Sequence, residues 1–552
     1  MTPGGVSRRA GLILALVTLI FSAEALKVSA TRLYPNYDEI DYLALGRQVA
    51  RNGGVVGTVR CYLQGRCLED NRPPLYQLLL SPVLDETPAA FARAKLFSLA
   101  IGLGLIALVW AITRRVMSAP AALAAAVLVG LMPVMADYAA RLMHDVLFAG
   151  LTFAAVYAMV ACQDRGAIAW SGAGALIGLA FLTKGSGHLL WLPLFATSLY
   201  RHRRALPRRL GLYAALVAFA AVAFFLLWRN WVVWHAPFHN INAGEVWLDR
   251  WSEVWVMRLS PEHRQLGLGW YLRHHSILDL VLKVGKGVGQ VVGLFIYTAG
   301  VGFWNPVARV VTGLGILVLA GLGLRRRWRA GRQVEVVAVL STVGAYALAL
   351  TLGTSGAPGP QVRYVLPYVL LLVPYAALEL CEGALPRLRA RFTSPQRRAE
   401  VAVLAMFAAL AALLSLRLAL GASVALRTDP RTLYAVEPRW RETSEWLSHA
   451  LAPGERFALP YMSRYSTWDL PRPDLDARWP FSFGVAAPSL LGYLEKQGIR
   501  KVLIDTADSG WAEYADKLGR QVDAKGPLAF LDWPRCFADE PAPSRFMIFC
   551  RP

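Results

Sequence analysis

The feature that most constrains this chain is a series of long apolar runs. A helix needs roughly 20 consecutive apolar residues to cross a bilayer, and about eleven stretches of the 552-residue chain approach that length. They are 11–30, 92–112, 119–136, 143–162, 166–183, 186–200, 210–228, 304–324, 333–352, 365–381 and 400–420. We predict an α-helical polytopic membrane protein with about 11 transmembrane helices. Composition agrees with this prediction. Only 17% of the residues are charged, against about a quarter in soluble proteins, and 56% are hydrophobic, against about half.

Arginine clusters follow many of these runs and indicate the orientation. They are Arg8/Arg9, Arg114/Arg115, 201–209, 325–332 and 387–398. Lys and Arg are enriched in cytoplasmic loops, so eleven crossings put the N-terminus in the cytoplasm and the C-terminus outside the inner membrane. The net charge of +21 does not indicate nucleic-acid binding, because no basic stripe with interleaved aromatics accompanies it.

Two apolar segments leave alternatives open. The stretch 284–303 is apolar enough to span, but a crossing there would invert every later loop, so we predict an interfacial or re-entrant helix. The first run ends in Val28-Ser29-Ala30, which resembles a signal-peptidase site. We expect this run to be kept as an anchor.

Three segments are expected outside: 31–91, 229–283 and the chain after about 421. We predict a membrane domain over 1–420 and a small extracytoplasmic α/β domain over 421–552. Its expected strands are Arg456–Pro460, Lys501–Asp505, Leu528–Asp532 and Phe546–Cys550, and its expected helices are Ser489–Gly498 and Trp511–Gln521.

Four of the six cysteines fall in segments expected outside, where disulfides persist. We predict the pairs Cys61–Cys67 and Cys536–Cys550. A zinc site at Cys61 and Cys67 is disfavoured, because their spacing and the lack of further ligands do not match structural zinc sites.

The first external segment carries an acidic start and a basic end. Asp38, Glu39 and Asp41 follow the first span, and Asn71-Arg72-Pro73-Pro74-Leu75-Tyr76 precedes the second. A solvated acidic loop is the simplest interpretation. A carboxylate near the membrane surface, however, can also act as a general base, and an Arg can bind a phosphate.

These residues resemble a known family, the GT-C glycosyltransferases. The resemblance rests on Asp38-Glu39, on Arg72-Pro73-Pro74-Leu75-Tyr76, on Thr183-Lys184-Gly185 and on Arg363-Tyr364. It is strongest to the protein O-mannosyltransferase and aminoarabinose-transferase group and to enzymes modifying lipopolysaccharide cores. The resemblance implies inverting transfer of a sugar from a polyprenyl-phosphate donor to an external acceptor. Lipid A or lipopolysaccharide, another envelope glycan and a secreted protein all fit as acceptors.

The same resemblance implies roles for individual residues. Asp38 matches the catalytic acid position, with Glu39 beside it, and Asp145 matches a second acidic signature. Arg72, Lys184 and Arg363 are expected to bind the donor phosphate. Expected substrate contacts are Tyr42, Asn71, Tyr76, His144 and Tyr364. Relatives often carry Glu where this chain has Asn71, and the aminoarabinose transferases have Arg where it has Asp41, which weakens the case for aminoarabinose.

Several readings remain beside this one. Lys184 at a span end could simply reach toward the interface. The loop 229–283 is rich in Trp and His and could be an aromatic belt or a sugar contact. We predict no tightly bound metal, although some GT-C branches use a divalent cation. The pair Gly174 and Gly178 is expected to serve helix packing.

The strongest rival function is a polytopic transporter or flippase of a lipid-linked or anionic substrate. Transporters commonly place ionisable groups at the membrane midplane between repeated halves. Here the ionisable residues gather at span ends and in external loops. A ligase or polymerase of surface polysaccharide is a third reading, which shares the lipid-linked donor. The expected partners are the lipid donor, an envelope acceptor and membrane lipids.

Overall fold

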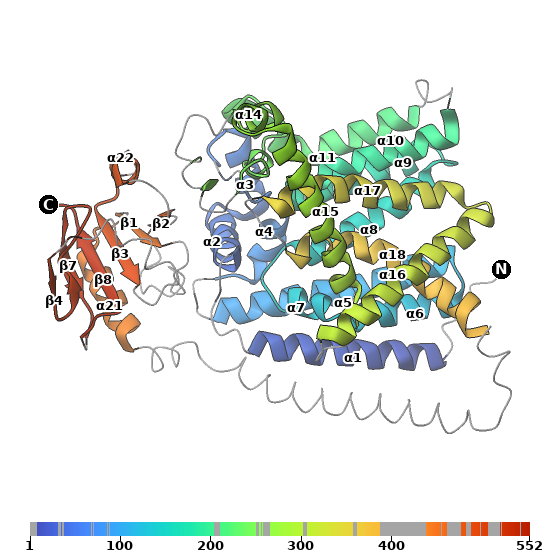
Figure 1. Ribbon diagram of the computed structural model, residues 1–552, viewed down its shortest axis with the longest axis horizontal. Coiled ribbons are helices and arrows are strands. Elements are labelled where there is room, and N and C mark those ends of the chain that lie inside the picture. Colours follow the sequence, from blue (N-terminus) through green and yellow to red (C-terminus); the bar gives the residue numbers. More distant parts are fainter. Residues whose placement is uncertain are drawn as a thin grey trace.

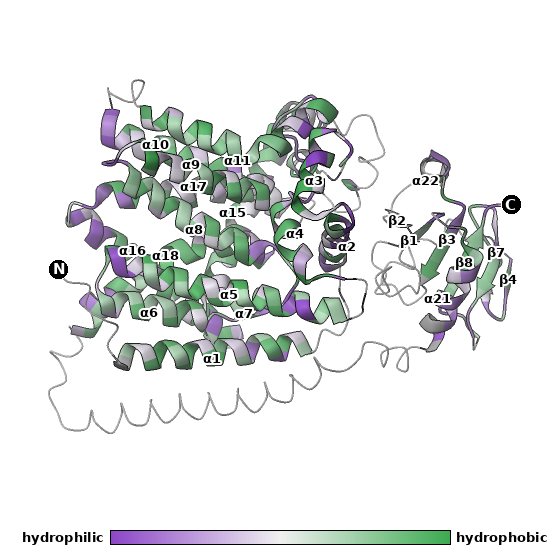
Figure 2. Ribbon diagram, turned by 180° about the vertical axis from the view of Figure 1, so that it is seen from behind, coloured by the Kyte–Doolittle hydropathy of each residue, from purple (hydrophilic) through white to green (hydrophobic). Residues whose placement is uncertain are grey.

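A computed structural model describes most of the chain, as a helical bundle and a smaller region with a β-sheet. The described residues are 8–30, 35, 38–67, 69, 71–85, 87, 89–203, 210–249, 253–254, 257, 265–301, 306–356, 361–386, 438–453, 455–460, 476–481, 487–496, 498–505, 519, 521–540 and 542–552. Figure 1 shows most long helices lying side by side in the bundle. Hydrophobic residues run along these helices in Figure 2, as expected for segments surrounded by lipid.

Eight of the described helices are long and apolar enough to cross a membrane. They are α1 (Arg8–Ala30), α5 (Ala89–Val116), α8 (Asp145–Cys162), α11 (Leu210–Trp234), α15 (Ile277–Ala299), α16 (Pro306–Arg329), α17 (Gln333–Ser355) and α18 (Leu366–Glu379) with the turn that follows it. A ninth is counted if α6 (Ala119–Gly130) and α7 (Pro133–Ala139), which meet at a 63° bend, form one broken span. The predicted polytopic helical fold is thereby confirmed.

The remaining predicted spans are shorter here or lie outside the described residues. The run 166–183 is the 17-residue helix α9 (Ala167–Thr183). The run 186–200 begins in a 3-10 helix, η2 (Gly185–Leu190), and continues as α10 (Trp191–His202). The run 400–420 lies outside the described residues. An apolar window counts residues and not helical continuity, so it could not predict the break at Gly185.

Ion pairs join the Arg-rich helix ends at one end of the bundle. Arg327, at the end of α16, donates to the carbonyl oxygen of Val116 at the end of α5 (3.0 Å) and pairs with Glu335 at the start of α17. Beside it, Arg326 pairs with Glu379 at the end of α18 (2.8 Å). The start of α16 and the end of α17 therefore lie together at the opposite end of the bundle.

Helix α15 takes a different course from its neighbours (Figure 1). Gly287 packs against the carbonyl of Thr351 near the end of α17, and the carbonyl of Ile296 packs against Gly313 near the start of α16. Both contacts lie at the end of the bundle away from the Arg pairs. Helix α15 thus packs against the end of α17 and the start of α16. It is also long and apolar enough to span, so the interfacial helix predicted for 284–303 stays a prediction. It is one unbroken helix of 23 residues, which does not fit a re-entrant loop.

Small residues let the bundle helices approach closely. A Cβ at Gly174 of α9 would overlap the carbonyl of Ala215 on α11, and one at Gly178 would lie 3.0 Å from side-chain atoms of Val222. The predicted packing role of these two glycines is confirmed. Helix α18 runs through the bundle with every residue from Leu366 to Glu379 buried.

Three short helices follow α1 at the end of the bundle away from the Arg pairs. They are α2 (Asp38–Arg51), α3 (Gly54–Leu63) and α4 (Leu75–Leu80). The predicted disulfide between Cys61 and Cys67 is present and closes the turn after α3. Arg229 of α11 donates to the carbonyl oxygen of Cys67 (3.1 Å), so this turn is held against the bundle.

The C-terminal region forms a mixed sheet with strand order β2-β1-β3-β8-β7-β6. The strands are β1 (Arg456–Pro460), β2 (Asp476–Phe481), β3 (Lys501–Asp505), β6 (Ala529–Phe530), β7 (Trp533–Ala538) and β8 (Phe546–Cys550), and the helices are α21 (Pro438–Ala450) and α22 (Ala487–Lys496). A separate ribbon pairs β4 (Val522–Asp523) with β5 (Gly526–Pro527). The small C-terminal α/β region is confirmed, as is the disulfide Cys536–Cys550.

Sequence patterns located some C-terminal elements and missed others. Three predicted strands coincide with β1, β3 and β8. The strand predicted at Leu528–Asp532 shortens to β6, because Leu531 and Asp532 adopt positive φ angles of 50° and 66°. Strands β2 and β7 were not predicted, and the helix predicted at Trp511–Gln521 falls almost wholly outside the described residues.

Candidate active site

A large cavity lies at the end of the bundle away from the Arg pairs. Its volume is about 1040 Å³, slightly above the range of about 300–1,000 Å³ that is typical of small-molecule sites. It is lined by α2, the turn before α4, the α7–α8 connection, the start of η2, residues between 238 and 246, the end of α17, the 3-10 helix η5 (Val362–Tyr364) and the start of α18. Nearly every segment that turns back at this end of the bundle thus contributes to one cavity.

Asp38 lies at the centre of the charged group in this cavity. One carboxylate oxygen accepts from Arg72 (2.7 Å) and the other accepts from Arg363 (2.5 Å). Burial alone would raise the pKa of Asp38, but the two guanidinium groups outweigh it and hold that pKa well below its usual range. Asp38 is therefore ionised at neutral pH. Its position in the first turn of α2 also favours a negative charge.

Arg72 bridges two carboxylates. The nitrogen that donates to Asp38 also lies 2.5 Å from an oxygen of Asp41. The backbone amides of Asn71 and Arg72 donate to the carboxylate of Glu69 (2.9 Å each), which fixes the turn before the Pro-Pro pair. Burial raises the pKa of Asp41 to about 6, with Arg72 opposing the shift and Glu69 and Asp38 adding to it.

A second ion pair lies at the wall of the cavity. Asp145, the first residue of α8, is 1% exposed and pairs with Lys184 at 3.1 Å. Lys184 caps the C-terminus of α9 and places its ammonium 5.1 Å from the ring centre of Tyr364. Lys184 lines the cavity while Asp145 lies behind it. A charge this deeply buried needs such a partner.

Glu39 and His144 line the cavity but are engaged with protein groups. Glu39 is buried and accepts from the backbone amide of Leu142 (3.0 Å), so it anchors the α7–α8 connection to α2. His144 hydrogen-bonds through Nδ1 to the hydroxyl of Tyr42. Burial lowers the pKa of His144 to about 4, which keeps the imidazole neutral at physiological pH.

Some expected contact residues do not reach the cavity. Tyr76 is fully buried, packs edge-on against Tyr42 and hydrogen-bonds to Ser98 (2.7 Å). Its direction on α4, toward α5, makes it a packing residue. The described Trp and His residues of the loop 229–283 do not line the cavity either. Several of them stack in pairs, such as Trp234 on His239 and Trp270 on His274.

The cavity contains residues that the sequence analysis did not identify. Among them are Ser186, His188, Asn240, Asn242, Glu245, Gln361, Tyr346 and Tyr368. The two asparagines carried a weak signal, since they are alternate polar residues in an external loop. The two tyrosines carried none, because aromatic residues inside apolar runs look like packing residues.

The arrangement suits chemistry on an anionic lipid. Four cations, Arg72, Arg141, Lys184 and Arg363, line the cavity, and each pairs with a carboxylate. An anion that enters can take over these charge-assisted hydrogen bonds and release Asp38 from its partners. Among the described residues, no group of three or more His, Cys, Asp or Glu side chains is arranged to hold a metal ion.

Comparison with known proteins gives a family model that matches part of the chain. Residues 71–228 match the family model described as dolichyl-phosphate-mannose-protein mannosyltransferase. The matched stretch includes Arg72, Asp145 and Lys184, whereas Asp38 and Arg363 lie outside it. No curated protein matches the sequence.

The fold is similar to those of solved membrane glycosyltransferases. ArnT from Cupriavidus metallidurans in the apo state has 15% identity and a TM-score of 0.55, with 98% of each chain covered. The same protein bound to undecaprenyl phosphate has 14% identity and a TM-score of 0.50, with 99% of this chain and 98% of that chain covered. The oligosaccharyltransferase of Archaeoglobus fulgidus in complex with Zn and sulfate has 14% identity and a TM-score of 0.51, with 89% of this chain and 68% of that chain covered. The fold is therefore similar to that of these solved membrane glycosyltransferases, and residues 71–228 match the mannosyltransferase family model.

Proposed function

We propose that the chain transfers a sugar from a polyprenyl-phosphate donor to an acceptor of the cell envelope, with inversion at the anomeric carbon. The observation that carries this proposal is the pairing of Asp38 with both Arg72 and Arg363 inside a cavity of about 1040 Å³. A general base and phosphate-binding cations thus meet at one point. The end of the bundle that holds them is the one expected outside the membrane.

Three of the cavity cations are assigned to the donor phosphate. Arg72 and Arg363 bind its oxygens directly, and Lys184 adds a third positive charge from the wall of the cavity. Positive groups at these positions stabilise the negative charge that develops on the phosphate as the sugar leaves. The polyprenyl chain then extends along the apolar surface of the bundle.

Asp38 acts as the general base. Its carboxylate accepts the proton of the acceptor hydroxyl while that oxygen forms a bond to the anomeric carbon and the bond from this carbon to the phosphate oxygen breaks. The products are the glycosylated acceptor and polyprenyl phosphate. When the donor phosphate accepts the hydrogen bonds of the two guanidinium groups, Asp38 loses their stabilising charge. Burial then raises the pKa of Asp38 again, which makes its carboxylate a stronger base when donor is bound.

The remaining predicted residues support these groups. Glu39 holds the connection that carries His144 and Asp145, and Asp145 positions Lys184. Tyr364 places its ring beside the Lys184 ammonium, and Asn71 faces the sugar. Lipid A or lipopolysaccharide, another glycan and a secreted protein remain the acceptor classes that fit.

The test is a comparison of envelope glycans, glycolipids and secreted proteins by mass spectrometry. The strains are a deletion strain and the same strain complemented with wild-type protein or with Asp38→Asn. We expect a sugar-sized mass to be lost on deletion, to return with the wild type and to stay absent with Asp38→Asn at equal membrane abundance. Loss of a catalytic base lowers rates by about 10²- to 10⁴-fold.

A matched control is Asp164→Asn, the same change at an exposed carboxylate that pairs with Arg201 at the Arg-rich end of the bundle. It should behave as wild type. Full activity of Asp38→Asn would refute the assignment of the base. No glycan change on deletion, in cells that express the gene, would refute the transferase reaction and favour transport.

A further inference from the structure

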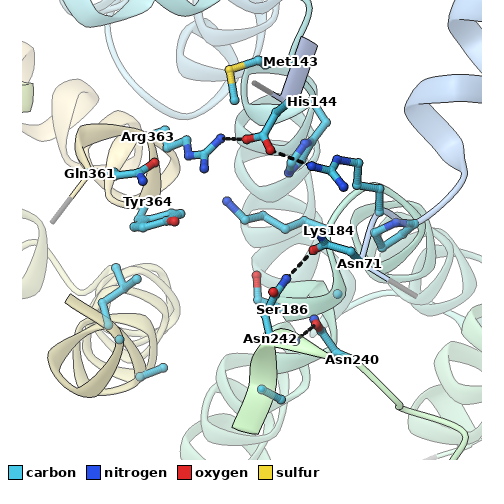
Figure 3. A pocket seen from close by; sticks show the side chains of 18 of the residues that line it. Asn71, Met143, His144, Lys184, Ser186, Asn240, Asn242, Gln361, Arg363 and Tyr364 are labelled. Carbon is cyan, nitrogen blue, oxygen red and sulfur yellow. Dashed lines mark hydrogen bonds and ion pairs between the residues drawn. The ribbon is translucent and has the colours of Figure 1, made fainter. Parts of the chain in front are cut away.

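A second polar group lies in the same cavity, apart from the ion pairs. It consists of Asn71, Ser186, Asn240 and Asn242, which we call the amide group (Figure 3). Asn242 donates through its side-chain nitrogen to the side-chain oxygen of Asn71 (2.5 Å), and its backbone amide donates to the side-chain oxygen of Asn240 (3.0 Å). The first external segment, the turn after α9 and the loop after α11 thus meet in one uncharged group.

The backbone around the amide group is fixed by partly buried hydrogen bonds. Asn230, at the end of α11, donates to the carbonyl oxygens of Pro237 (3.0 Å) and His239 (3.3 Å). The hydroxyl of Tyr346 donates to the carbonyl oxygen of Ser186 (2.7 Å). A side chain at Gly185 would overlap the amide nitrogen of Asn240, so glycine at this position makes room for that amide. A group held this rigidly is suited to recognise a specific shape.

The amide group has hydrogen-bonding capacity left over. Within the described part of the chain, the side-chain nitrogens of Asn71 and Asn240 and the hydroxyl of Ser186 have no hydrogen-bond partner, and all three residues line the cavity. Amides and hydroxyls both donate and accept. Sugar hydroxyls do the same, so the two sets complement each other without any net charge.

Charge argues against a cationic ligand at this place. Lys184 directly precedes Gly185 and Ser186 in the chain, and Figure 3 shows its side chain between the amide group and the pair of Arg363 with its carboxylate. Its ammonium would repel the ammonium of an amino sugar. The acidic residues that line the cavity are all engaged with protein groups. Asp38 and Asp41 are bound to Arg72, and Glu39 accepts from the amide of Leu142. Glu245, on the same short helix as Asn242, is 1% exposed and also has an interaction partner. A buried cation that lacks a carboxylate partner is costly.

We propose that Asn71, Ser186, Asn240 and Asn242 form a subsite for the hydroxyl groups of an uncharged sugar ring. This inference rests on the proposed function, because the sugar ring that binds here is one of that reaction's two substrates. It is either the donor sugar, which the phosphate-binding cations bring near Asp38, or the acceptor glycan that attacks the donor sugar. Donor sugar and acceptor glycan share the same chemistry. The experiment below separates the two sources.

The first arm measures lipid binding by native mass spectrometry of the full chain in detergent. The probes are decaprenyl phosphate, decaprenyl-phosphate mannose and a decaprenyl phosphate that carries a 4-amino-arabinose. We expect wild-type protein to bind the mannose lipid more tightly than the amino-sugar lipid. Asn240→Ala and Ser186→Ala should each lower affinity for the mannose lipid by about three- to tenfold, the effect of one lost hydrogen bond, and leave affinity for the bare lipid unchanged.

A carboxylate variant keeps the test valid if the alanine variants fold poorly. Asn240→Asp is nearly the same size and should shift preference toward the amino-sugar lipid. Asn52→Ala, in the exposed turn after α2, serves as the matched control and should bind all three lipids as wild type does.

The second arm measures the glycan modification in complemented cells. If the variants bind all lipids as wild type but lower the modification more than about tenfold, the subsite holds the acceptor glycan. If binding and modification both match wild type, or if wild type prefers the amino-sugar lipid, the subsite proposal is wrong. Absence of binding to any of the three lipids by wild type would instead overturn the proposed function as a whole.

Discussion

A single guanidinium nitrogen of Arg72 contacts two carboxylates of the charged group in the cavity. That nitrogen donates to Asp38 and also contacts Asp41, so a positive charge at this point matters more than the shape of the guanidinium group. We expect Arg72→Lys to retain activity within about tenfold of wild type. Arg72→Ala should lower activity by about 100-fold or more, because removal of one partner of a desolvated charge pair costs about 2–5 kcal/mol.

The measurement is the yield of modified glycan per amount of membrane protein in the complemented strain. Arg93→Ala provides the control, since this arginine pairs with Asp85 where both side chains are over 40% exposed. Equal activity of Arg72→Ala and wild type would exclude the assigned phosphate contact.

Asp41 gives the site a dependence on pH. Its pKa is raised to about 6 by burial, so between pH 7.5 and 5.5 it takes up a proton and loses its negative charge, while Asp38 stays ionised. A polyprenyl phosphodiester keeps one negative charge over this range. Affinity for it should therefore rise by roughly three- to tenfold as the pH falls, as expected when one nearby negative charge is removed.

Titration of a decaprenyl-phosphate mannose probe at a series of pH values tests this expectation. Asp41→Asn should bind at pH 7.5 as tightly as wild type does at pH 5.5 and show no inflection near pH 6. Asp85→Asn, at an exposed carboxylate outside the cavity, should keep the wild-type profile. A flat wild-type profile would contradict the raised pKa of Asp41.

Which site residues could be predicted depended on the kind of signal they carry. Asp38, Arg72 and Lys184 stand out because ionisable side chains are costly at membrane boundaries, and the cavity brings them together. Glu39 carries the same signal, but its carboxylate accepts a hydrogen bond from the backbone amide of Leu142. Asn240 and Asn242 have no charge to mark them, and their place beside Asn71 depends on a contact between distant segments.

Helices α9 and α11 form a close contact whose stability depends on one glycine. A Cβ at Gly174 would overlap the backbone of Ala215, whereas a Cβ at Gly172, on the same helix, would meet no atom within 4 Å. We expect Gly174→Ala to destabilise the protein by about 1–3 kcal/mol through overpacking. Gly172→Ala should be neutral or slightly stabilising, since Ala favours a helix over Gly by about 1 kcal/mol.

Thermal unfolding of both variants in the same detergent compares two identical substitutions. A lower midpoint for Gly174→Ala alone is the expected result. Similar midpoints for the two variants would mean that α9 and α11 can separate without loss of stability.

Among the elements, continuous apolar helices were predictable and breaks in them were not. The windows located α1, α5 and α8 because a long run of apolar residues is itself the signal. The turn at η2 is set by a close approach, because a Cβ at Gly187 would overlap the backbone of Ala180 and Phe181. No local pattern encodes that contact.

The molecule as a whole has one end rich in arginine and one end that holds the cavity. Arg114, Arg201 and Arg326 lie in the last turns of their helices, at the end where the ion pairs join α5, α16 and α18. From the positive-inside rule we predict that this end faces the cytoplasm and that the cavity and the C-terminal sheet lie outside.

Reporter fusions test this orientation. Alkaline phosphatase, which is active only after export, should be active when fused after Pro552 and inactive when fused after Arg329. A cytoplasmic fluorescent reporter at the same two positions should give the opposite pattern. Alkaline phosphatase activity at Arg329 but not at Pro552 would invert the assigned orientation.

The distance along the chain between the paired site residues has a consequence for biosynthesis. Asp38 and Arg363, which share a hydrogen bond, are separated by 325 positions in the sequence. A nascent chain inserts its segments in order, so Asp38 and Arg72 meet early while their last partner has not yet been translated. No prefix of this polypeptide that stops before η5 contains the complete charged group. The ribosome thus finishes most of the protein before the charged group is complete, and we predict that a premature stop codon upstream of residue 363 leaves a membrane-inserted but inactive fragment.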